Sequence, residues 1–590
     1  MSLRDLVDQW LILDPNPETR HEIQSLWDRK EYDELDKRLR TRIEFGTAGL
    51  RGRMEAGWSR MNDLIIIQTS QGLAEYVLKH VTNAKMRGLV VGHDHRHHSE
   101  HWADLTAKIF VAKGFRVYPL QGLNHTPMVP FGVKKLNAAC GVMITASHNP
   151  KQDNGYKVYW ENAVQIISPH DEGIALSIQA DLQPQPSELD ANISSSLTVD
   201  LTEELRNDYF DYLKTLSSTD ALNRQLSVKF VNTSLHGVGD PFVKRAFELY
   251  GFPPYIPVKE QQQPDPEFST VKFPNPEEKG ALDLALKTAN TIGADYVLAQ
   301  DPDSDRFTAA EKRPNGEWIL YTGDQLGSLF ASQVLQAYKS SGKPVNKLAI
   351  VASTVSSKMI EEMAKIEGFK FAECLTGFKF IGNTGLNLVD DGYDVPFGYE
   401  EAIGFMFGTQ IRDKDGVAAT VMFAELVASL RAQGKTIYDH LQELYKRYGY
   451  FETSNSYFVS TDPKITDEIF AHIRQRDPTD DLSTYPKTLG GLNINRIIDL
   501  TTGYDSGNPP DFTPSLPLSS GHMIQVRAGD PIEKVKLVLT LRTSGTEPKI
   551  KYYLEGNGSN PQTVNSLLSR AIEDISNNWI QSSKYSLPRA

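Results

Sequence analysis

The chain has 590 residues, of which 40% are hydrophobic and 23% charged. This profile is typical of a soluble globular protein with roughly four domains. A formal charge of −13 argues against a general nucleic-acid binder and means that any anionic substrate needs a locally basic pocket. The two cysteines, Cys140 and Cys374, form no CxxC site and fit a reducing compartment.

The amino-terminal residues predict amphipathic helices. Residues 1 to about 45 are dense in Asp, Glu, Arg and Leu at helical spacing. Charges at Arg4, Asp5 and Asp8 are unlike a basic-then-apolar export signal, and no apolar run approaches 18 residues. We therefore expect a cytoplasmic protein with no membrane partner.

A glycine-rich segment with two arginines follows, from Glu44 to Arg53. A loop of this kind has a flexible backbone that can approach an anion, while the guanidinium group of Arg51 or Arg53 holds it. An ordinary glycine-rich surface turn explains the same residues, so the segment alone leaves both interpretations open.

The next stretch has the alternation of a parallel α/β sheet. Residues 88–94 predict a strand and a turn, 99–112 a helix and 116–120 a second strand, which together form a βαβ unit. The stretch also carries a cluster of histidines whose spacing matches no usual zinc pattern, so a solvated turn is favoured over a metal site. These histidines are His93, His95, His97, His98 and His101.

An apolar run at 138–144 predicts a buried strand that ends in Thr-Ala-Ser-His-Asn-Pro, residues 145–150. Ligands bind at the carboxyl edge of open α/β sheets, where this strand delivers the Ser147 hydroxyl. A serine hydroxyl needs a base, a metal or a charged neighbourhood to react. His148 is adjacent, but neighbours on an extended loop usually point apart, so a simple Ser–His pair is doubtful. A plain strand and turn is the alternative.

Lys157 follows Ser147 by ten residues. A hairpin-like return would bring its ammonium group over the serine, to steady phosphate charge or to carry a proton with a lowered pKa. An exposed strand lysine is the alternative. The polar residues 180–225 then predict a segment between domains.

A second α/β rhythm contains strands at 226–231 and 294–300, a helix at 240–249 and an irregular loop at 261–266. Its last strand ends in three carboxylates at alternate positions, which form a hard-oxygen site for Mg²⁺ with open positions for a phosphate oxygen. A calcium loop of the EF-hand type fails because its sixth position is Arg306 and its twelfth is Lys312. The carboxylates are Asp301, Asp303 and Asp305.

A third unit begins with a strand at 347–352 and a helix at 358–366. A glycine-flexed loop at 376–382 carries a lysine, and a loop at 397–404 carries Glu400 and Glu401, whose carboxylates suit sugar hydroxyls. Residues 411–416 open a further helix.

From about residue 450 the pattern changes to alternating strands. One of them leads into Arg542-Thr543-Ser544-Gly545-Thr546, where hydroxyls and backbone amides around a glycine predict a nest for a phosphate monoester. Lys549 and Lys551 follow, and helical spacing over 563–580 closes the chain.

The serine loop, the three-aspartate loop, the Gly-Tyr-Glu-Glu-Ala-Ile-Gly loop and the Arg-Thr-Ser-Gly-Thr loop stand in an order that resembles the α-D-phosphohexomutase superfamily. The type-two phosphoglucomutase/phosphopentomutase branch is the most similar. The resemblance implies an α/β fold of three related domains with mixed, mostly parallel sheets, plus a C-terminal α+β domain, around a central cleft. The expected domains are 1–215, 216–322, 323–450 and 451–590, which carry the phosphoserine, metal, sugar and phosphate loops in that order.

The resemblance also implies a role for each matching residue. Ser147 would be phosphorylated, and one Mg²⁺ per active site would be held by a phosphoserine oxygen with Asp301, Asp303 and Asp305. Glu400 would bind sugar hydroxyls, and the retained phosphate would be gripped by Arg542, Ser544 and Thr546. Basic positions of the active site would be Arg51, Lys157, Arg306, Lys379 and Lys414, with Lys157 and Lys414 as candidates for proton transfer and charge relief. We also expect His148 among the catalytic residues, and further substrate contacts from Thr376, Gly377, Glu401, Gly545 and Lys551.

The expected enzyme is an isomerase of carbohydrate metabolism that moves a phosphoryl group between C1 and C6 of glucose, or between C1 and C5 of ribose and deoxyribose. A sugar 1,6-bisphosphate would be its intermediate and activator. Ala402 stands where many hexose mutases have Ser, which loosens hexose discrimination. The alternatives are a glucose 1,6-bisphosphate synthase that uses 1,3-bisphosphoglycerate, and a non-catalytic phosphosugar-binding protein. Expected partners are small sugar phosphates only, bound by a monomer.

Overall fold

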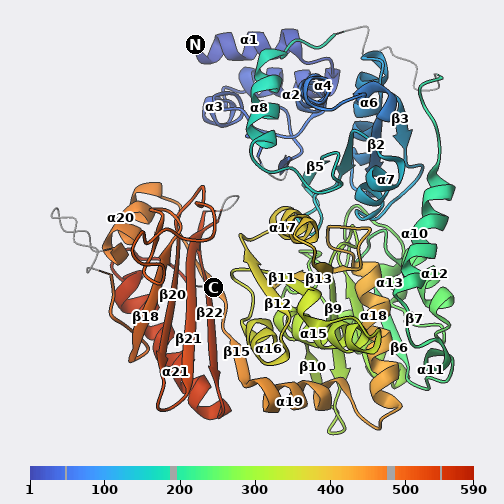
Figure 1. Cartoon of the computed structure of the whole chain (residues 1–590). Helices are drawn as coiled ribbons and strands as arrows, with labels where there is room; N and C mark the ends of the chain where they lie inside the picture. Colours follow the sequence, from blue (N-terminus) through green and yellow to red (C-terminus); the bar gives the residue numbers. More distant parts are fainter. Residues whose placement is uncertain (47–48, 186–195, 475–484, 545–547, 590) are drawn as a thin grey trace. The chain divides into compact units, whose positions relative to one another are not determined.

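The computed structural model describes residues 1–589 except 47–48, 186–195, 475–484 and 545–547 (Figure 1). The chain divides into two compact units. Unit 1 consists of Met1–Val351 and Gly377–Ile437, and unit 2 of Ala352–Thr376 and Tyr438–Ala590. The two units are described separately below.

Three helices begin unit 1, as the residue spacing predicts. The first starts at a capping box in which Ser2 and Asp5 exchange side-chain and backbone hydrogen bonds, and the second starts at Asn16 with Pro17 in its first turn. Their apolar faces join the core of the first α/β domain. The helices are α1 Leu3–Leu13, α2 Pro17–Asp28 and α3 Tyr32–Leu39.

The first sheet has the order β1-β5-β4-β2-β3, in which β2, β3 and β4 are parallel, β5 is antiparallel to β4, and β1 is antiparallel to β5. Its strands are β1 Leu50–Arg53, β2 Leu89–His93, β3 Val117–Pro119, β4 Cys140–Ile144 and β5 Asp153–Tyr159. Residues 50–53 are therefore an edge strand, and the predicted glycine-rich loop is wrong there, because pairing with β5 extends the backbone. Residues 47–48 of that segment lie outside the described residues.

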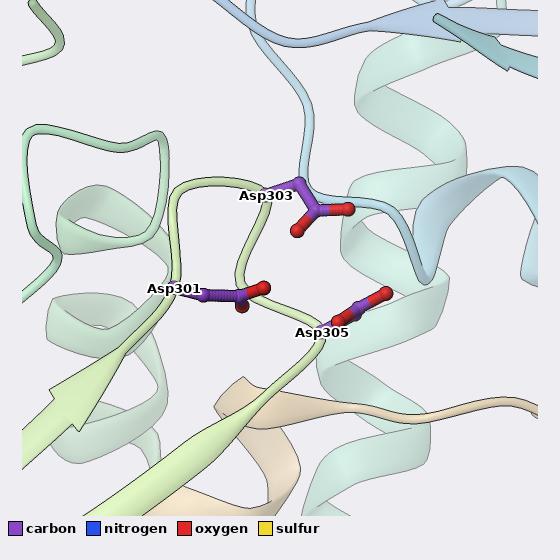
Figure 2. A group of neighbouring side chains, drawn as sticks. All are labelled: Asp301, Asp303 and Asp305. Carbon is purple, nitrogen blue, oxygen red and sulfur yellow. The ribbon is translucent and has the colours of Figure 1, made fainter. Parts of the chain in front are cut away.

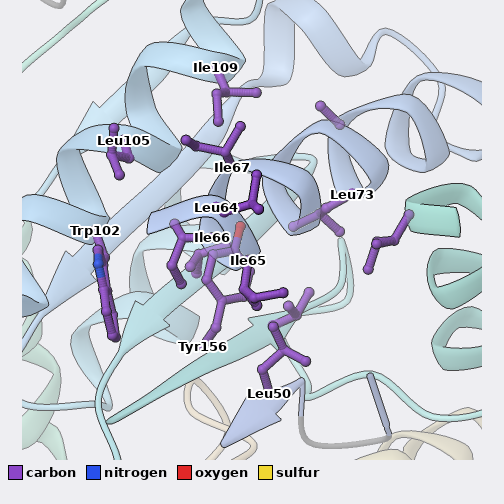
Figure 3. Packing of buried hydrophobic residues seen from close by; sticks show 14 of the residues in the cluster. Leu50, Leu64, Ile65, Ile66, Ile67, Leu73, Trp102, Leu105, Ile109 and Tyr156 are labelled. Carbon is purple, nitrogen blue, oxygen red and sulfur yellow. The ribbon is translucent and has the colours of Figure 1, made fainter. Parts of the chain in front are cut away.

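Helices cover the first sheet, and the amphipathic spacing that predicted α6 is confirmed. In Figure 3, Ile65 and Ile66 of α4 pack with Trp102 and Leu105 of α6 and with Tyr156 of β5. Burial of such large side chains provides the main driving force for folding. The helices are α4 Asp63–His80, α5 Ala84–Arg87, α6 Ser99–Ala112, α7 Met128–Leu136 and α8 His170–Ala180.

The second sheet has the order β10-β9-β8-β6-β7. Again three strands are parallel, β6, β7 and β8; β9 is antiparallel to β8, and β10 is antiparallel to β9. Its strands are β6 Phe230–Thr233, β7 Ile256–Pro257, β8 Tyr296–Gln300, β9 Phe307–Lys312 and β10 Trp318–Leu320. Its helices are α10 Thr202–Leu216, α11 Asp220–Arg224, α12 Asp240–Tyr250, α13 Lys259–Gln262 and α14 Asp283–Ile292.

Three expectations for this region need correction. The polar segment 180–225 contains the helix α10, which buries Tyr209 and Phe210 on one face. The strand expected at 226–231 begins only at Phe230, and residues 261–262 end the short helix α13 instead of starting a loop. Composition hid α10 because its exposed face is strongly charged.

The third sheet has the order β12-β11-β13-β14. Lys379 lies in the first turn of the helix α17, so the predicted loop at 376–382 is wrong, and Glu400 ends a strand where we expected a loop. The elements are α15 Gly323–Ser340, η1 Val345–Lys347, β11 Leu348–Ser353, α16 Met359–Glu367, β12 Lys370–Cys374, α17 Phe378–Asp390, β13 Asp394–Glu400, β14 Gly404–Phe407 and α18 Gly416–Arg431.

One strand order recurs in all three sheets. The first strand of the pattern is central, the second lies on one side of it and the third on the other, followed by an antiparallel strand. The third strands are β4, β8 and β13, which end three residues before Ser147, directly before Asp301 and at Glu400. The expectation of three related α/β domains with mixed sheets is confirmed, and the same strand of each sheet leads to a predicted site residue.

Unit 2 is built around an antiparallel sheet with the order β15-β22-β21-β20-β18-β17. Leu539 and Leu554 lie in its core with Phe470 and Val564, and Arg474 pairs with Asp499 in the interior. The elements are α19 Ile437–Tyr448, β15 Tyr450–Thr453, β16 Ser456–Val459, α20 Pro463–Arg474, β17 Thr488–Leu489, β18 Leu492–Asp499, β19 Tyr504–Asp505, β20 Met523–Asp530, β21 Val535–Thr543, β22 Lys549–Gly558, α21 Pro561–Asp574 and η3 Ile575–Trp579. Within the described part of the chain, each helix is too short or too polar to cross a membrane.

Close packing of α4 on α8 gives a test of the first domain. A Cβ added at Gly72 would lie 2.5 Å from the Cα of Ile178, so Gly72→Ala should destabilise unit 1 by about 1–3 kcal/mol. Gly385 in α17 has its nearest neighbour at 3.6 Å, and Gly385→Ala should be neutral or stabilising by up to about 1 kcal/mol. Melting curves of both variants check this; equal melting temperatures would contradict the packing.

Candidate active site

Ser147 lies at the carboxyl end of β4 in a left-handed conformation, with φ 54°. Its side chain is buried, and its Oγ donates a hydrogen bond to Asp301 Oδ2 over 2.8 Å. The Nδ1 atom of His148 lies 3.3 Å from the same Oγ. Our expectation that the two neighbours point apart is therefore wrong, because the positive φ at Ser147 turns the loop sharply.

His148 is held in its neutral form. Burial, with the charges of Arg306 and Arg51 nearby, lowers the pKa of His148 well below its usual value. A neutral imidazole nitrogen next to a hydroxyl can accept its proton, which is what a serine requires in order to react.

The three aspartates of the β8–β9 loop converge on one small space (Figure 2). All three are buried, and one carboxylate oxygen from each lies within 4.8 Å of the others. The Oδ1 atoms of Asp303 and Asp305 are buried without a hydrogen-bond partner. Oxygen ligands only, with two unpaired carboxylate oxygens, fit a hard divalent cation such as Mg²⁺. Among the described residues, this is the one acidic, His or Cys cluster with such geometry.

The electrostatics of the cluster favour a bound cation. Burial and the charges of Asp303 and Asp305 raise the pKa of Asp301 well above its usual value. Burial acts in the same direction on Asp303, but the ammonium group of Lys157 outweighs it and lowers the pKa of Asp303. Like charges in a low-dielectric interior repel strongly, so a cation between them would stabilise the site.

Lys157 and Lys414 bind these carboxylates. The Nζ atom of Lys157 lies 2.7 Å from Asp303 Oδ2 and 3.1 Å from Asp305 Oδ2, and Lys414 Nζ lies 3.4 Å from Asp305 Oδ2. The predicted hairpin return is confirmed, since Lys157 pairs with Met143 across β4 and β5. The predicted lowering of its pKa is wrong: burial acts that way, but Asp303 and Asp305 outweigh it and raise the pKa of Lys157.

Two arginines add positive charge next to the serine loop. Arg51 Nη1 donates to Asn149 Oδ1 over 3.2 Å, and the backbone N–H of Arg306 donates to Asp301 Oδ1 over 2.9 Å. Burial and the charge of Arg306 lower the pKa of Arg51, so the two guanidinium groups influence each other. The Nε atom of Arg306 is buried without a hydrogen-bond partner. Two cations in such proximity form a site for an anion.

Glu400 is the carboxylate that the third sheet contributes to the predicted site residues of unit 1. It ends β13, and pairing of Glu400 with Gly404 fixes the short turn that contains Glu401 and Ala402. Burial raises the pKa of Glu400 to about 7, helped by Glu401 and opposed by Lys414. Gly404 is required where it stands, since a Cβ there would meet the Lys414 side chain at 2.4 Å. Gly377 caps the helix α17 that carries Lys379.

The other predicted substrate residues belong to unit 2. Arg542 Nη2 donates to the Tyr553 hydroxyl over 3.0 Å, and its buried Nε has no hydrogen-bond partner. Lys551 is paired with Arg542 across β21 and β22, which places both on one face of the sheet. The backbone N–H of Ser544 donates to Lys549, and the Thr376 hydroxyl is buried without a hydrogen-bond partner. Gly545 and Thr546 lie outside the described residues.

Sequence reasoning missed two residues next to the site. Thr126 donates its hydroxyl to Asp303 Oδ2 over 2.5 Å and lies 3.4 Å from Lys157 Nζ. Its position after β3, a strand that ends at the ligand edge of a parallel sheet, was the available signal. Glu277 is exposed and lies near Glu401 and Glu400, whose charges raise its pKa, and near Arg306, which opposes them. No residue pattern marks it.

Asp303→Asn should weaken Mg²⁺ binding at least roughly tenfold, because an amide oxygen replaces a charged ligand. Calorimetric titration of the purified protein with Mg²⁺ measures this directly. Asp295→Asn, an exposed position before β8, serves as the matched control and should bind like the wild type. Equal affinity of the Asp303 variant and the wild type would contradict the metal site.

The chain was compared with known proteins. Three family models match it in order, described as phosphoglucomutase/phosphomannomutase alpha/beta/alpha domains I, II and III. They match residues 42–185, 207–316 and 322–448. Each of these spans contains one of the repeated strands β4, β8 and β13.

Relatives of the whole chain carry related names. A protein named "Probable phosphoribomutase" of Schizosaccharomyces pombe is 46% identical over 94% of both chains. The human phosphopentomutase is 43% identical over 99% of this chain and 97% of its own, and the human glucose 1,6-bisphosphate synthase 42% over 98% and 95%.

A solved structure shares the fold. The open form of the phosphoglucomutase parafusin from Paramecium matches with a TM-score of 0.67 at 19% identity, over 92% of this chain and 95% of that chain. The matching domains, the whole-length relatives and the serine–aspartate site together show that the chain belongs to the phosphoglucomutase/phosphomannomutase family of phosphosugar mutases, in the α-D-phosphohexomutase superfamily.

Proposed function

We propose that this protein interconverts the 1- and 5-phosphates of ribose and deoxyribose, and the 1- and 6-phosphates of glucose, through a phosphorylated Ser147. The observation that carries the proposal is the hydrogen bond of 2.8 Å from Ser147 Oγ to Asp301, which brings a serine nucleophile into a buried metal-type site. The names of the relatives support pentose phosphates as substrates.

Different residues of unit 1 would have different roles in phosphoryl transfer. Asp301, Asp303 and Asp305 would hold one Mg²⁺ together with a phosphoserine oxygen, and the ion would supply charge neutralisation on the transferring group. Arg51 and Arg306 would bind the phosphoryl oxygens. Lys157 and Lys414, kept protonated by the aspartates, would add positive charge and would not act as bases.

The reaction would proceed in two balanced transfers. The free hydroxyl of a sugar monophosphate attacks the phosphorus of phospho-Ser147; the new sugar O–P bond forms, and the bond from phosphorus to Oγ breaks. One proton passes from the sugar hydroxyl to Ser147 Oγ, and the sugar becomes a bisphosphate. After the intermediate reorients, Ser147 Oγ attacks the other phosphate: the new Oγ–P bond forms and the sugar O–P bond breaks. The neutral His148, 3.3 Å from Oγ, is placed to take the serine proton, and one proton passes to the departing sugar oxygen.

Recognition of the sugar would depend, in unit 1, on the turn between β13 and β14. Glu400 would accept hydrogen bonds from sugar hydroxyls, with Glu401, Gly377 and Lys379 as further substrate contacts. Ala402 offers no hydroxyl, which supports acceptance of the smaller pentoses. The retained phosphate would be bound by Arg542, Ser544, Gly545, Thr546 and Lys551, with Thr376 as a further contact.

Several finer points belong to the same proposal. A sugar 1,6-bisphosphate would prime the enzyme by phosphorylating Ser147, and the protein would act as a cytoplasmic monomer without nucleic-acid partners. We retain the four domains that the motifs predict, with boundaries at 215, 322 and 450.

A second candidate is a glucose 1,6-bisphosphate synthase. It is favoured by the human synthase, which is 42% identical over nearly the whole chain, almost as similar as the phosphopentomutase. A binding protein without activity is disfavoured, because Ser147, the three aspartates and Lys157 meet in one buried site.

Ser147→Ala should lower kcat at least ~10³-fold, because no phosphoenzyme can form. Turnover of ribose 1-phosphate and glucose 1-phosphate, each with catalytic sugar bisphosphate, measures the mutase activity. Ser341→Ala, at an exposed serine after α15, is the control and should keep wild-type activity.

Two results would overturn the proposal in different ways. Wild-type rates in Ser147→Ala would exclude a phosphoserine mechanism. Faster formation of glucose 1,6-bisphosphate from glucose 1-phosphate and 1,3-bisphosphoglycerate than of any isomerised monophosphate would establish the synthase instead.

Glu400 predicts a pH effect on substrate binding. With a pKa of about 7, Glu400 gains charge between pH 6 and 8, and a charged carboxylate accepts sugar hydroxyls better, so KM should fall as pH rises. Glu400→Gln should have a higher KM, and its KM should lack the fall with rising pH that the ionisation of Glu400 causes. Ionisation of the substrate phosphate affects both proteins equally, so parallel pH profiles would contradict the assignment.

The same substitution has an effect on stability whose sign is fixed. Burial raises the pKa of Glu400 in the folded protein, so the wild type loses stability as pH rises from about 4.5 to 7. Glu400→Gln should therefore become more stable relative to the wild type over this pH range, as melting curves would show.

A further inference from the structure

Arg96 binds the backbone of the serine loop, residues 145–153, through its guanidinium group. It follows β2, the strand beside β4, and its side chain exposes none of its surface. Its Nη2 donates to the carbonyl oxygens of Ser147 and Asn149 over 2.7 and 2.6 Å. Its Nη1 donates to those of Pro150 and Asp153 over 2.9 and 3.1 Å. One guanidinium group therefore ties together four carbonyls of the loop.

Asp94 connects the same loop from its other end. Its Oδ2 accepts the Thr145 hydroxyl over 2.6 Å and lies 3.4 Å from Arg96 Nε. Its Oδ1 accepts from the Ser99 hydroxyl and from the backbone of Arg96. Thr145 Oγ1 in turn accepts the backbone N–H of Ser147 over 2.9 Å. A chain of hydrogen bonds thus runs from a buried carboxylate to the backbone of the nucleophile.

A loop of the second domain also contacts Arg96 and the serine loop. The ring of Phe268, on the loop after α13, lies 4.9 Å from the guanidinium carbon of Arg96, and Phe268 is itself buried. Next to it, Glu267 binds Lys151 of the serine loop over 2.6 Å. Arg96 is therefore held between loop carbonyls and an aromatic face, which restricts its motion.

We propose that Asp94, Arg96 and Thr145 form a positioning network for the proposed phosphoserine. The network holds Ser147 in its left-handed conformation, with Oγ directed at Asp301, so that the phosphoryl group meets a sugar hydroxyl in preference to water. None of the three touches the reacting atoms in the structure. The inference rests on the proposed function of Ser147. It assigns to these residues the preference for transfer of the phosphoryl group to the sugar over its hydrolysis.

The chemistry of arginine suits this task. Its planar guanidinium has five N–H donors in a fixed fork, whereas lysine has three donors on one atom that cannot span four carbonyls. A left-handed residue other than glycine persists only where its surroundings fix it, so the loop should relax when these hydrogen bonds are lost. A misplacement of the reacting group by about 1 Å costs about 10²-fold in rate.

The decisive comparison is Thr145→Val with Thr145→Ser. Valine keeps the shape and loses the hydroxyl, while serine keeps the hydroxyl. We expect Thr145→Val to lower kcat by about 10- to 100-fold, with KM and Mg²⁺ affinity close to those of the wild type. Trapped enzyme labelled with radioactive phosphate should also release a larger share of its label to water than to sugar. Thr145→Ser should restore both quantities to nearly wild-type values.

Arg96→Lys gives a second, independent test. It should reproduce the loss of kcat and the shift towards hydrolysis, while Arg29→Lys, at an arginine with 59% of its side chain exposed, should change neither. Melting curves identify folded variants, and only these are scored. A folded Thr145→Val or Arg96→Lys protein with wild-type kcat and wild-type release of label to sugar overturns the network.

The experiment separates the inference from the proposed function. If the wild type takes no label on Ser147 from a sugar bisphosphate, the phosphoserine mechanism fails, and the inference fails with it. If the wild type is labelled but Thr145→Val and Thr145→Ser behave alike, only the network is refuted. A rise in KM at unchanged kcat would also refute it, because that result assigns Thr145 to substrate binding.

Discussion

Three carboxylates buried within reach of one another are the constraint on which the rest of unit 1 depends. Like charges in the interior repel strongly, and the fold surrounds them with compensating groups: the ammonium groups of Lys157 and Lys414, the Thr126 hydroxyl and the backbone N–H of Arg306. Two carboxylate oxygens still have no hydrogen-bond partner, which is the structural reason to place a cation there. The proposed nucleophile belongs to the same arrangement because Ser147 donates to Asp301.

The repeated sheet explains how residues so far apart in sequence meet. Each sheet places its third strand in the same position relative to the first two, and β4, β8 and β13 each deliver one functional group at their carboxyl ends. The hairpin that follows adds a charged residue: Lys157 after β4, Arg306 after β8 and Glu401 after β13. A single supersecondary pattern, used three times, therefore supplies the proposed nucleophile, the proposed metal ligands and the proposed sugar contact.

Much of this could be predicted from the sequence, because apolar strands followed by unusual polar loops are a local signal. Ser147 and the aspartates were found in this way. The helix α10 was missed, since its charged face resembles a linker in composition. The Lys157 pKa was predicted with the wrong sign, because the lysine's partners come from another domain. Contacts of that kind, including Phe268 on Arg96, depend on tertiary packing that no local pattern contains.

The short hairpin between β13 and β14 has a consequence for how such proteins diversify. Pairing of Glu400 with Gly404, and of Tyr399 with Phe405, anchors both sides of the turn. The partly exposed side chains of Glu401 and Ala402 can therefore change without breaking this pairing, whereas Ile403 is buried and its carbonyl accepts the Phe307 N–H. Under the proposed function, sugar preference and phosphoryl chemistry would then lie on separate pieces of backbone, so descendants of one ancestor could exchange substrates while the reaction itself stays the same.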